Sequence, residues 1–241
     1  MTQKRYKHIF FDLDNTLWDF TTNSYHALKI AFNEFKIERQ YADYDYFYEV
    51  YTRNNKMLWR DYRLKKVVKK ELIKLRFQNT FDELGIKRID PRDFNEYYLN
   101  EMPKQKALID GVPELLDYLK SKRYYLYIIT NGFREVQHKK LKNSGLTEYF
   151  TRIYISEDIK IPKPGYEIFE YAVKSANARK NNSIMVGDDI ESDIKGANNF
   201  GIDAVHFCRE KSDRIKIQNY EFLSANMVYS IKSIGELKSF L

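Results

Sequence analysis

The 241-residue sequence contains one cysteine, Cys208, so no disulfide bond can form within the chain. This excludes the disulfide-rich secreted class of proteins. With 9 glycines and 5 prolines, the chain is also too poor in both for a collagen-like or linker-like protein. Its apolar runs, such as residues 124–129, are far shorter than the roughly 20 residues of a membrane-spanning helix. We therefore expect a cytoplasmic protein without membrane association.

Aromatic residues and charge are abundant instead. The 20 Tyr, 16 Phe and 2 Trp supply ample apolar surface for a core, which excludes an intrinsically disordered chain. The formal net charge is +7, and the excess of Lys and Arg lies in residues 56–76. Such a segment is typical of a nucleic-acid-binding surface or of a solvated helix face. We favour the helix face and expect no nucleic acid polymer as a partner.

Short apolar runs alternate with helical patterns over much of the chain. Strands are expected at residues 6–11, 124–129, 152–155, 183–186 and 203–207. Helices are expected from Pro113 and over residues 134–143, 165–176 and 190–200. Strands that alternate with helices indicate right-handed βαβ units and a parallel sheet. The expected fold class is therefore α/β, with a Rossmann-like parallel-sheet core.

Residues 18–107 contain no convincing strand pattern. Four helices are expected there, at residues 23–37, 43–60, 64–84 and 91–101. One helical stripe consists of Tyr44, Phe47, Tyr48 and Tyr51, which we interpret as core packing rather than a base-stacking platform. The sequence thus predicts an all-helical insertion, residues 18–107, within an α/β core formed by residues 1–17 and 108–241.

Chemically capable side chains follow the expected strands. Asp12 and Asp14 come directly after the first strand and point to the same side if the chain is extended. The second strand is followed by Thr130, Asn131 and Gly132, a sequence that can hold an oxyanion through its hydroxyl and backbone N–H groups. Each pattern alone is also an ordinary turn between a strand and a helix.

Two further patterns complete the set. Lys163 stands between two prolines, which restrict its backbone. The fourth strand leads into a run of acids that indicates a metal site or N-terminal helix capping: Asp188, Asp189, Glu191 and Asp193. Ligands of open α/β sheets bind at the carboxyl ends of the strands, so we expect all these side chains to gather at one edge.

Taken in order, the patterns resemble the four motifs of the haloacid dehalogenase superfamily: Asp12-x-Asp14-x-Thr16, Thr130, Lys163 and Gly187-Asp188-Asp189-x-x-x-Asp193. The resemblance covers essentially the whole chain and assigns residues 18–107 to the helical C1-type cap of these enzymes. A shorter resemblance is to a bacterial group of nucleotidases. It rests on Asn55-Lys56-x-Leu58-Trp59-x-Asp61-Tyr62 in the cap and on the opening Asp-Asn-Thr-Leu-Trp-Asp-Phe of residues 14–20. That group acts on pyrimidine and noncanonical nucleoside 5′-monophosphates.

The resemblance implies a Mg²⁺-dependent phosphomonoester hydrolase. Asp12 would attack phosphorus and form an aspartyl-phosphate, and Asp14 would serve as general acid and base. The ion would bind the Asp12 carboxylate, the Asp14 backbone carbonyl and Asp188. Phosphate oxygens would be held by Thr130, Asn131, Gly132 and Lys163. The supporting residues would be Thr16, Asp189 and Asp193.

The same resemblance leaves several activities open. Asp14 and Asp188 argue against the dehalogenases themselves, which lack the first acid and do not use magnesium. A small-molecule phosphomonoester is the expected partner, and we favour a nucleoside 5′-monophosphate. The alternatives are a phosphatase of small sugar or acid phosphates, a phosphomutase, and a catalytically silent binding protein. Candidate substrate contacts in the cap are Trp18, Lys56, Trp59, Arg60 and Arg63. Whether the protein is a monomer or a homodimer stays open.

Overall fold

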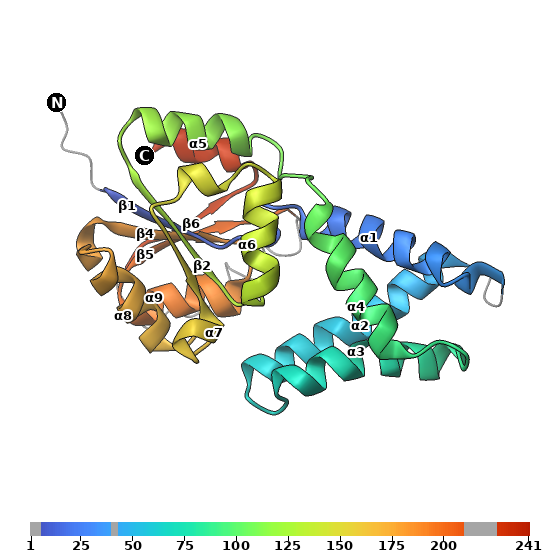
Figure 1. The fold of residues 1–241 in the computed structure, drawn as a ribbon. Helices are drawn as coiled ribbons and strands as arrows, with labels where there is room; N and C mark the ends of the chain where they lie inside the picture. Colours follow the sequence, from blue (N-terminus) through green and yellow to red (C-terminus); the bar gives the residue numbers. More distant parts are fainter. Residues whose placement is uncertain (1–5, 40–42, 210–225) are drawn as a thin grey trace. The chain divides into compact units, whose positions relative to one another are not determined.

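The computed structural model describes residues 6–39, 43–209 and 226–241. The chain forms two compact units (Figure 1). One unit comprises Met1–Phe20 and Ala107–Leu241, and the other comprises Thr21–Lys106. The second unit is therefore an insertion that follows the first strand of the first unit.

A six-stranded sheet forms the centre of the first unit, with strand order β3-β2-β1-β4-β5-β6. Its strands are β1 His8–Phe11, β2 Tyr125–Thr130, β3 Arg152–Ile155, β4 Ser183–Gly187, β5 Asp203–Phe207 and β6 Val228–Ile231. All neighbouring strands run parallel. In β1, Phe11 pairs with Ile128 of β2 and Val186 of β4. The residues that follow β1, β2 and β4 therefore leave the sheet at one edge, which confirms the predicted α/β fold class.

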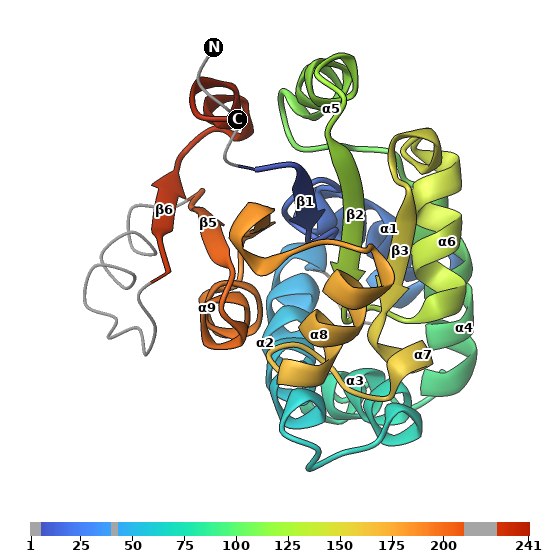
Figure 2. The same ribbon diagram turned by 90° about the vertical axis from the view of Figure 1, so that its left-hand side faces the viewer.

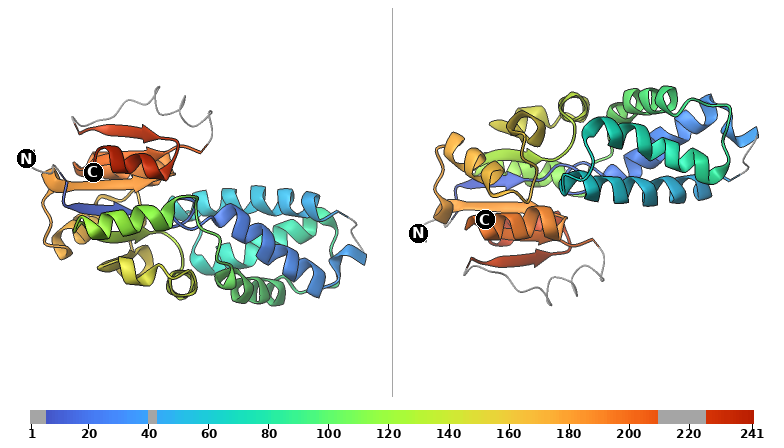
Figure 3. Two further views of the ribbon diagram at one scale, coloured as in Figure 1. Left: turned by 90° about the horizontal axis from the view of Figure 1, so that it is seen from above. Right: turned by 90° about the horizontal axis from the view of Figure 1, so that it is seen from below.

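Helices cover both faces of this sheet. They are α5 Val112–Ser121, α6 Arg134–Asn143, α7 Ser156–Ile159, α8 Tyr166–Ser175 and α9 Gly196–Phe200. Short 3-10 turns complete the unit: η3 Thr147–Tyr149, η4 Lys180–Asn182 and η6 Ile234–Ser239. Helix α5 and turn η6 lie on one face, and α8 and α9 lie on the other (Figure 2; Figure 3 gives the views from above and below). A buried cluster, including Phe10, Ile129 and Phe169, joins the sheet to α8 and α9.

Two details of this unit differ from the sequence-based expectation. The predicted helix over residues 190–200 is divided, because Ile190–Lys195 forms the π-helical turn η5 before α9 begins. The backbone N–H of Ile194 bonds to the carbonyl oxygen of Asp189 five residues earlier, at 3.4 Å. Strand β6 was not predicted, although it pairs with β5 along its length.

The second unit is all-helical in its described residues. Its elements are α1 Phe20–Glu34, η1 Ile37–Arg39, α2 Tyr44–Arg63, α3 Lys69–Leu84, α4 Pro91–Glu101 and η2 Met102–Lys104, with the first residue of α1 in the sheet unit. Asp43 caps α2 by accepting from the backbone N–H groups of Asp45 and Tyr46. Asp90 caps α4 by accepting from the N–H of Arg92. No helix among the described residues is long and apolar enough to cross a membrane.

The aromatic stripe of α2 is core packing, as predicted. Phe47 and Tyr51 are buried, and their rings contact aromatic side chains of α3 and α4. Tyr51 stacks on Phe77 with ring centroids 5.0 Å apart, and Phe47 meets Phe94 edge-on at 5.9 Å. Such contacts stabilise the bundle beyond the apolar area that they bury.

The predicted helix over residues 64–84 begins later than expected, at Lys69. Helix α2 continues instead to Arg63, and Lys65 takes a positive φ of 58° that ends the helical path. Most of the lysines in the basic segment are exposed, in agreement with a solvated helix face. Arg76, at the end of the segment, is buried instead: it is 2% exposed and donates through Nε to Asn95 Oδ1 at 2.8 Å.

Candidate active site

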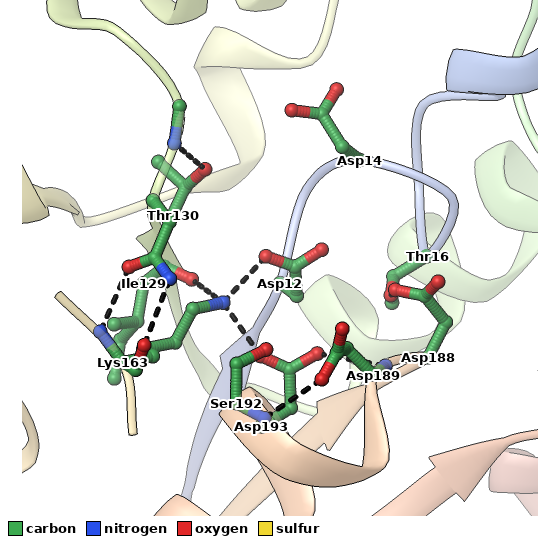
Figure 4. Close-up of polar contacts among 12 residues, drawn as sticks. Asp12, Asp14, Thr16, Ile129, Thr130, Lys163, Asp188, Asp189, Ser192 and Asp193 are labelled. Carbon is green, nitrogen blue, oxygen red and sulfur yellow. Dashed lines mark hydrogen bonds and ion pairs between the residues drawn. The ribbon is translucent and has the colours of Figure 1, made fainter. Parts of the chain in front are cut away.

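The carboxyl edge of the sheet brings together residues from β1, β2, β4 and the turn before α8 (Figure 4). Asp12 directly follows β1 and is buried, and its backbone N–H still bonds to the Val186 carbonyl of β4 at 2.9 Å. The last residue of β2, Thr130, is also buried. The edge therefore gathers a carboxylate and a hydroxyl over the centre of the sheet.

Lys163 is a buried cation at this edge, with a relative exposure of 1%. Its ammonium group lies 2.6 Å from Asp12 Oδ1, 2.7 Å from Asp193 Oδ1 and 2.7 Å from the Ile129 carbonyl oxygen. An ammonium group has three hydrogens, and each has an acceptor here. Burial alone would lower the pKa of Lys163, but the attraction of Asp12 and Asp193 raises it above its usual value. The group is therefore a fixed positive charge.

Asn131 holds the backbone of Lys163 in place. Its Nδ2 donates to the Lys163 carbonyl oxygen at 3.0 Å, and its Oδ1 accepts from the Lys163 N–H at 2.8 Å. The side chain predicted to bind phosphate thus connects the second and third motifs. Two hydrogen bonds to one residue fix both the position and the direction of the lysine-bearing turn.

Three carboxylates meet beside Lys163. Asp12, Asp188 and Asp193 each offer an oxygen, and these oxygens lie within 4.8 Å of one another. Burial raises the pKa of Asp12 to about 7, and the nearby Asp193 and Asp14 add to this rise against the attraction of Lys163. Burial and the repulsion from Asp12 also raise the pKa of Asp188 well above its usual range. The cluster has more negative charge than Lys163 alone compensates.

Asp193 is the most buried member of this cluster, with a relative exposure of 1%. Its Oδ2 accepts the backbone N–H of Asp189 at 3.2 Å, and Ser192 Oγ donates to its Oδ1 at 3.4 Å. Gly187 provides the room, because a Cβ atom there would lie 2.3 Å from Asp193 Oδ2. Asp189 caps η5 by accepting from the Ser192 N–H at 2.8 Å, which is the capping role considered for these acids.

Thr16 and His206 support Asp188 from two sides. Thr16 is fully buried, and its hydroxyl donates to Asp188 Oδ1 at 3.3 Å. His206 of β5 is buried and lies with Nε2 3.0 Å from the Asp188 carbonyl oxygen. Sequence reasoning placed Thr16 in the site and missed the contact of His206.

Asp14 lies apart from the carboxylate cluster, with its carboxylate directed away from Asp12 (Figure 4). Two residues of α6 that the sequence analysis did not single out hold it. Lys140 Nζ lies 2.7 Å from Asp14 Oδ1, and Gln137 Nε2 donates to Asp14 Oδ2 at 2.9 Å. Burial lowers the pKa of Lys140, and the attraction of Asp14 opposes this shift.

A sequence signal for these two residues existed in the helical period. Gln137 and Lys140 lie four and seven positions after the buried Phe133, on the same stripe as the buried Leu141. Polar residues on the apolar stripe of a helix are buried, and buried polar groups need partners. The stripe therefore indicates polar contacts on the buried face of α6.

The other candidate contacts lie in different surroundings. Trp18 belongs to the sheet unit, where its fully buried ring faces the Lys140 ammonium at 4.4 Å. The remaining candidates are on α2 of the helical unit, where Lys56 and Arg60 are exposed and Trp59 and Arg63 are half-buried. Trp59 packs edge-on against Tyr62 with ring centroids 5.6 Å apart.

The donor set of the site suits a hard divalent cation. Mg²⁺ prefers carboxylate, carbonyl and water oxygens, and it is commonly held by one or two carboxylates plus phosphate. Asp12 and Asp188 supply such carboxylates, and their raised pKa values reflect a surplus of buried negative charge that a cation would relieve. The residues present therefore fit Mg²⁺ chemically.

Comparison with known proteins adds a family and its relatives. The family model of haloacid dehalogenase-like hydrolases matches residues 9–207. Pyrimidine 5′-nucleotidase PynA of Streptococcus pneumoniae is 35% identical over 203 residues, 84% of this chain and 84% of that protein. Pyrimidine 5′-nucleotidase YjjG of Escherichia coli is 34% identical over 195 residues, 80% of this chain and 82% of that protein.

A solved structure is similar over nearly the whole chain. HAD-hydrolase YfnB of Bacillus subtilis, in a crystal form bound to magnesium, has a TM-score of 0.83 and 27% sequence identity. The match covers 98% of this chain and 98% of that one. The similarity therefore includes both the sheet unit and the helical unit.

Proposed function

The chain belongs to the haloacid dehalogenase-like hydrolases, and we propose that it hydrolyses nucleoside 5′-monophosphates with Mg²⁺ through an aspartyl-phosphate on Asp12. The observation that carries this proposal is the buried Asp12 carboxylate, held by Lys163 at 2.6 Å beside Asp188 and Asp193. A carboxylate fixed at the edge of the sheet is suited to covalent catalysis.

In the first half-reaction, an Asp12 oxygen attacks phosphorus and the ester P–O bond breaks. Asp14 enters this step in its protonated form, gives its proton to the departing alkoxide and becomes a carboxylate. In the second half-reaction, water attacks the phosphorus of the aspartyl-phosphate and gives a proton to Asp14. The P–O bond to Asp12 then breaks, and this restores the carboxylate and releases inorganic phosphate.

The remaining residues bind and orient the phosphoryl group. The Thr130 hydroxyl and the backbone N–H of Asn131 offer hydrogens to its oxygens, where the transition state accumulates charge, and Lys163 adds a positive charge beside them. Asp12, the Asp14 carbonyl and Asp188 would hold Mg²⁺. When bound, the ion neutralises the negative charge of the phosphate and of the carboxylates. Asp193 orients Lys163 through their 2.7 Å ion pair.

The substrate class rests on the two nucleotidase relatives and on the helical unit. We assign the helical unit, Thr21–Lys106, the role of a substrate-selecting cap, because it is inserted after the first motif. Lys56, Arg60 and Arg63 supply cations for the phosphate or sugar, and Trp59 supplies an aromatic surface for a base. Trp18 contributes from the sheet unit, next to Asp14.

The test is release of inorganic phosphate from a panel of phosphomonoesters, including dUMP, dTMP, UMP and several sugar phosphates, with Mg²⁺ and with EDTA. We expect hydrolysis that needs Mg²⁺, favours the nucleotides, and is lost in Asp12→Asn. Asp110→Asn, a change of the same kind at an exposed site of the sheet unit, is the matched control. Equal turnover in Asp12→Asn would exclude the covalent mechanism, and a preference for sugar phosphates would exclude the nucleotide assignment.

A further inference from the structure

We propose that Gln137 and Lys140, on one face of α6, are positioning residues that orient both Asp14 and Thr130 for phosphoryl transfer. The inference rests on the proposed phosphatase activity and extends the machinery to a helix that the four motifs do not include. Residues three apart in a helix project from the same face, and both side chains are buried.

Lys140 pairs with one oxygen of Asp14, and two aromatic rings contact its ammonium group. Its ammonium group lies 2.7 Å from Asp14 Oδ1 and 4.4 Å and 5.3 Å from the ring centroids of Trp18 and Phe20. Aromatic faces attract cations, and this attraction grows when water is excluded. The ammonium therefore has one defined position, and the Asp14 carboxylate is aligned to it.

Gln137 holds the other oxygen of Asp14 and joins it to Thr130. Its Nε2 donates one hydrogen to Asp14 Oδ2 at 2.9 Å and the other to Thr130 Oγ1 at 2.7 Å. A carboxylate can only accept, so the orientation of the amide follows from its partner. The Asp14 carboxylate and the Thr130 hydroxyl are therefore hydrogen-bonded to the same NH₂ group of Gln137.

The hydrogen bond from Gln137 determines whether the Thr130 hydroxyl donates or accepts toward a phosphate. Thr130 Oγ1 accepts from Gln137 and also from the backbone N–H of Gly132, at 3.2 Å. A hydroxyl oxygen has two acceptor positions and one hydrogen. With both acceptor positions taken, the hydrogen is left to be donated, which is what a phosphate oxygen requires.

Gly132 makes the approach of Gln137 possible. A Cβ atom at residue 132 would lie 2.3 Å from Gln137 Nε2 and 2.4 Å from its Cδ. Any larger residue would therefore displace the amide from Thr130 and Asp14. Gly132 therefore leaves room for the Gln137 side chain of α6, in addition to its place in the backbone turn.

The consequence for catalysis is specific. Both Asp14 oxygens have partners on α6, so the Asp14 side chain is oriented before substrate arrives. Without these partners the side chain is free to rotate, and proton transfer loses its geometry. Proton donation matters for an alkoxide leaving group and hardly for p-nitrophenolate, which departs without a proton. Proton acceptance from water matters for both substrates.

The test compares Lys140→Met with Lys139→Met, a matched loss of charge at the exposed neighbouring position of α6. In Lys140→Met we expect kcat on an alkyl monophosphate to fall by about 10²-fold or more, as for loss of general acid–base catalysis, with little change in KM. With p-nitrophenyl phosphate we expect a stoichiometric burst of p-nitrophenolate, followed by slow turnover, because the aspartyl-phosphate accumulates. Lys140→Arg should restore part of the rate.

A second variant covers the case in which Lys140→Met does not fold. Gln137→Leu removes a neutral amide and leaves the ion pair of Asp14 intact. We expect weaker binding of inorganic phosphate by calorimetry, because the Thr130 hydroxyl is no longer forced to donate, together with a reduced kcat. Unchanged phosphate affinity and unchanged kcat in a folded Gln137→Leu protein would overturn the role of Gln137.

The outcomes separate this inference from the proposed function. If wild type forms the covalent intermediate and Lys140→Met behaves like Lys139→Met, the positioning role is wrong and the phosphatase proposal stands. An equal loss on alkyl and aryl substrates without a burst also overturns it, since that pattern indicates general damage. If wild type hydrolyses no phosphomonoester, the proposed function fails, and this inference fails with it.

Discussion

Lys163 and Asp12 form a buried ion pair, with 2.6 Å between Nζ and Oδ1. The same ammonium group bonds to Asp193, so one cation pairs with two carboxylates from different elements, one directly after β1 and one in η5. Removal of one partner of such a pair leaves uncompensated buried charge. The pair therefore supports both the folded state of the site and the chemistry proposed for it.

Substitution of Lys163 should affect stability as well as activity. We expect Lys163→Met to lower the free energy of unfolding by about 3–5 kcal/mol without Mg²⁺, because Asp12 and Asp193 lose their shared cation. Chemical denaturation with and without Mg²⁺ measures the free energy of unfolding. Bound Mg²⁺ should restore part of the stability that Lys163→Met loses. Lys142→Met, at an exposed site, is the control. Equal stability of the two variants would contradict the role of the buried pair.

Metal binding should depend on pH near neutrality. Burial raises the pKa of Asp12 to about 7, so its carboxyl group is largely protonated below that pH in the metal-free protein. A cation must displace this proton, and metal binding therefore releases protons. We expect the affinity for Mg²⁺ to weaken as the pH falls through about 7. Calorimetry in buffers of different ionisation enthalpy detects the released protons, and a pH-independent affinity would refute the prediction.

Gly187 should tolerate no side chain. A Cβ atom there would lie 2.3 Å from Asp193 Oδ2, so Gly187→Ala must displace Asp193 from Lys163. We expect a destabilisation of about 1–3 kcal/mol, as for overpacking elsewhere, and a large loss of kcat. Gly235→Ala is the matched control, because its nearest neighbour would be 3.6 Å away. Urea denaturation and phosphate release measure both effects; a fully active Gly187→Ala enzyme would argue against this role of Asp193.

His8 should make the sheet unit sensitive to mild acid. Burial, aided by Lys7, lowers the pKa of His8 below 6.5, so the folded state disfavours the charged form. Its contribution to stability is complete above pH 6.5 and declines as the pH falls below that value, since the unfolded chain then binds more protons. The urea midpoint of wild type should fall more between pH 7.5 and 5.5 than that of His8→Gln. Identical pH profiles of the two proteins would rule this out.

Much of the site could be predicted because strand ends are simple to find. Asp12, Thr130 and Asp188 each follow a short apolar run that ends abruptly, and parallel strands bring their ends to one edge. Lys163 was found by its neighbouring prolines and by the resemblance. What these residues contact was less predictable: the amide of Asn131 bonds to the backbone of Lys163, a contact that depends on the path of a distant turn.

The features that escaped prediction depend on non-local contacts. Gln137 and Lys140 lie in a helix rich in charged residues, where lysines are usually solvated. Their burial follows from the position of α6 over Asp14. Strand β6 is short and is stabilised by its pairing with the edge of β5. The end of α2 is marked by no glycine or proline, and the positive φ of Lys65 decides it.

The contact between Lys140 and Trp18 makes the fluorescence of Trp18 an intrinsic reporter of the site around Asp14. The indole ring is fully buried with the ammonium 4.4 Å from its centroid, and its emission therefore responds to the charge beside it. The chain has 2 tryptophans, so Trp59→Phe leaves Trp18 as the sole indole chromophore. Movement of Asp14 away from Lys140 during turnover would then be visible as a change in fluorescence, on the millisecond scale of stopped-flow mixing and without any added label.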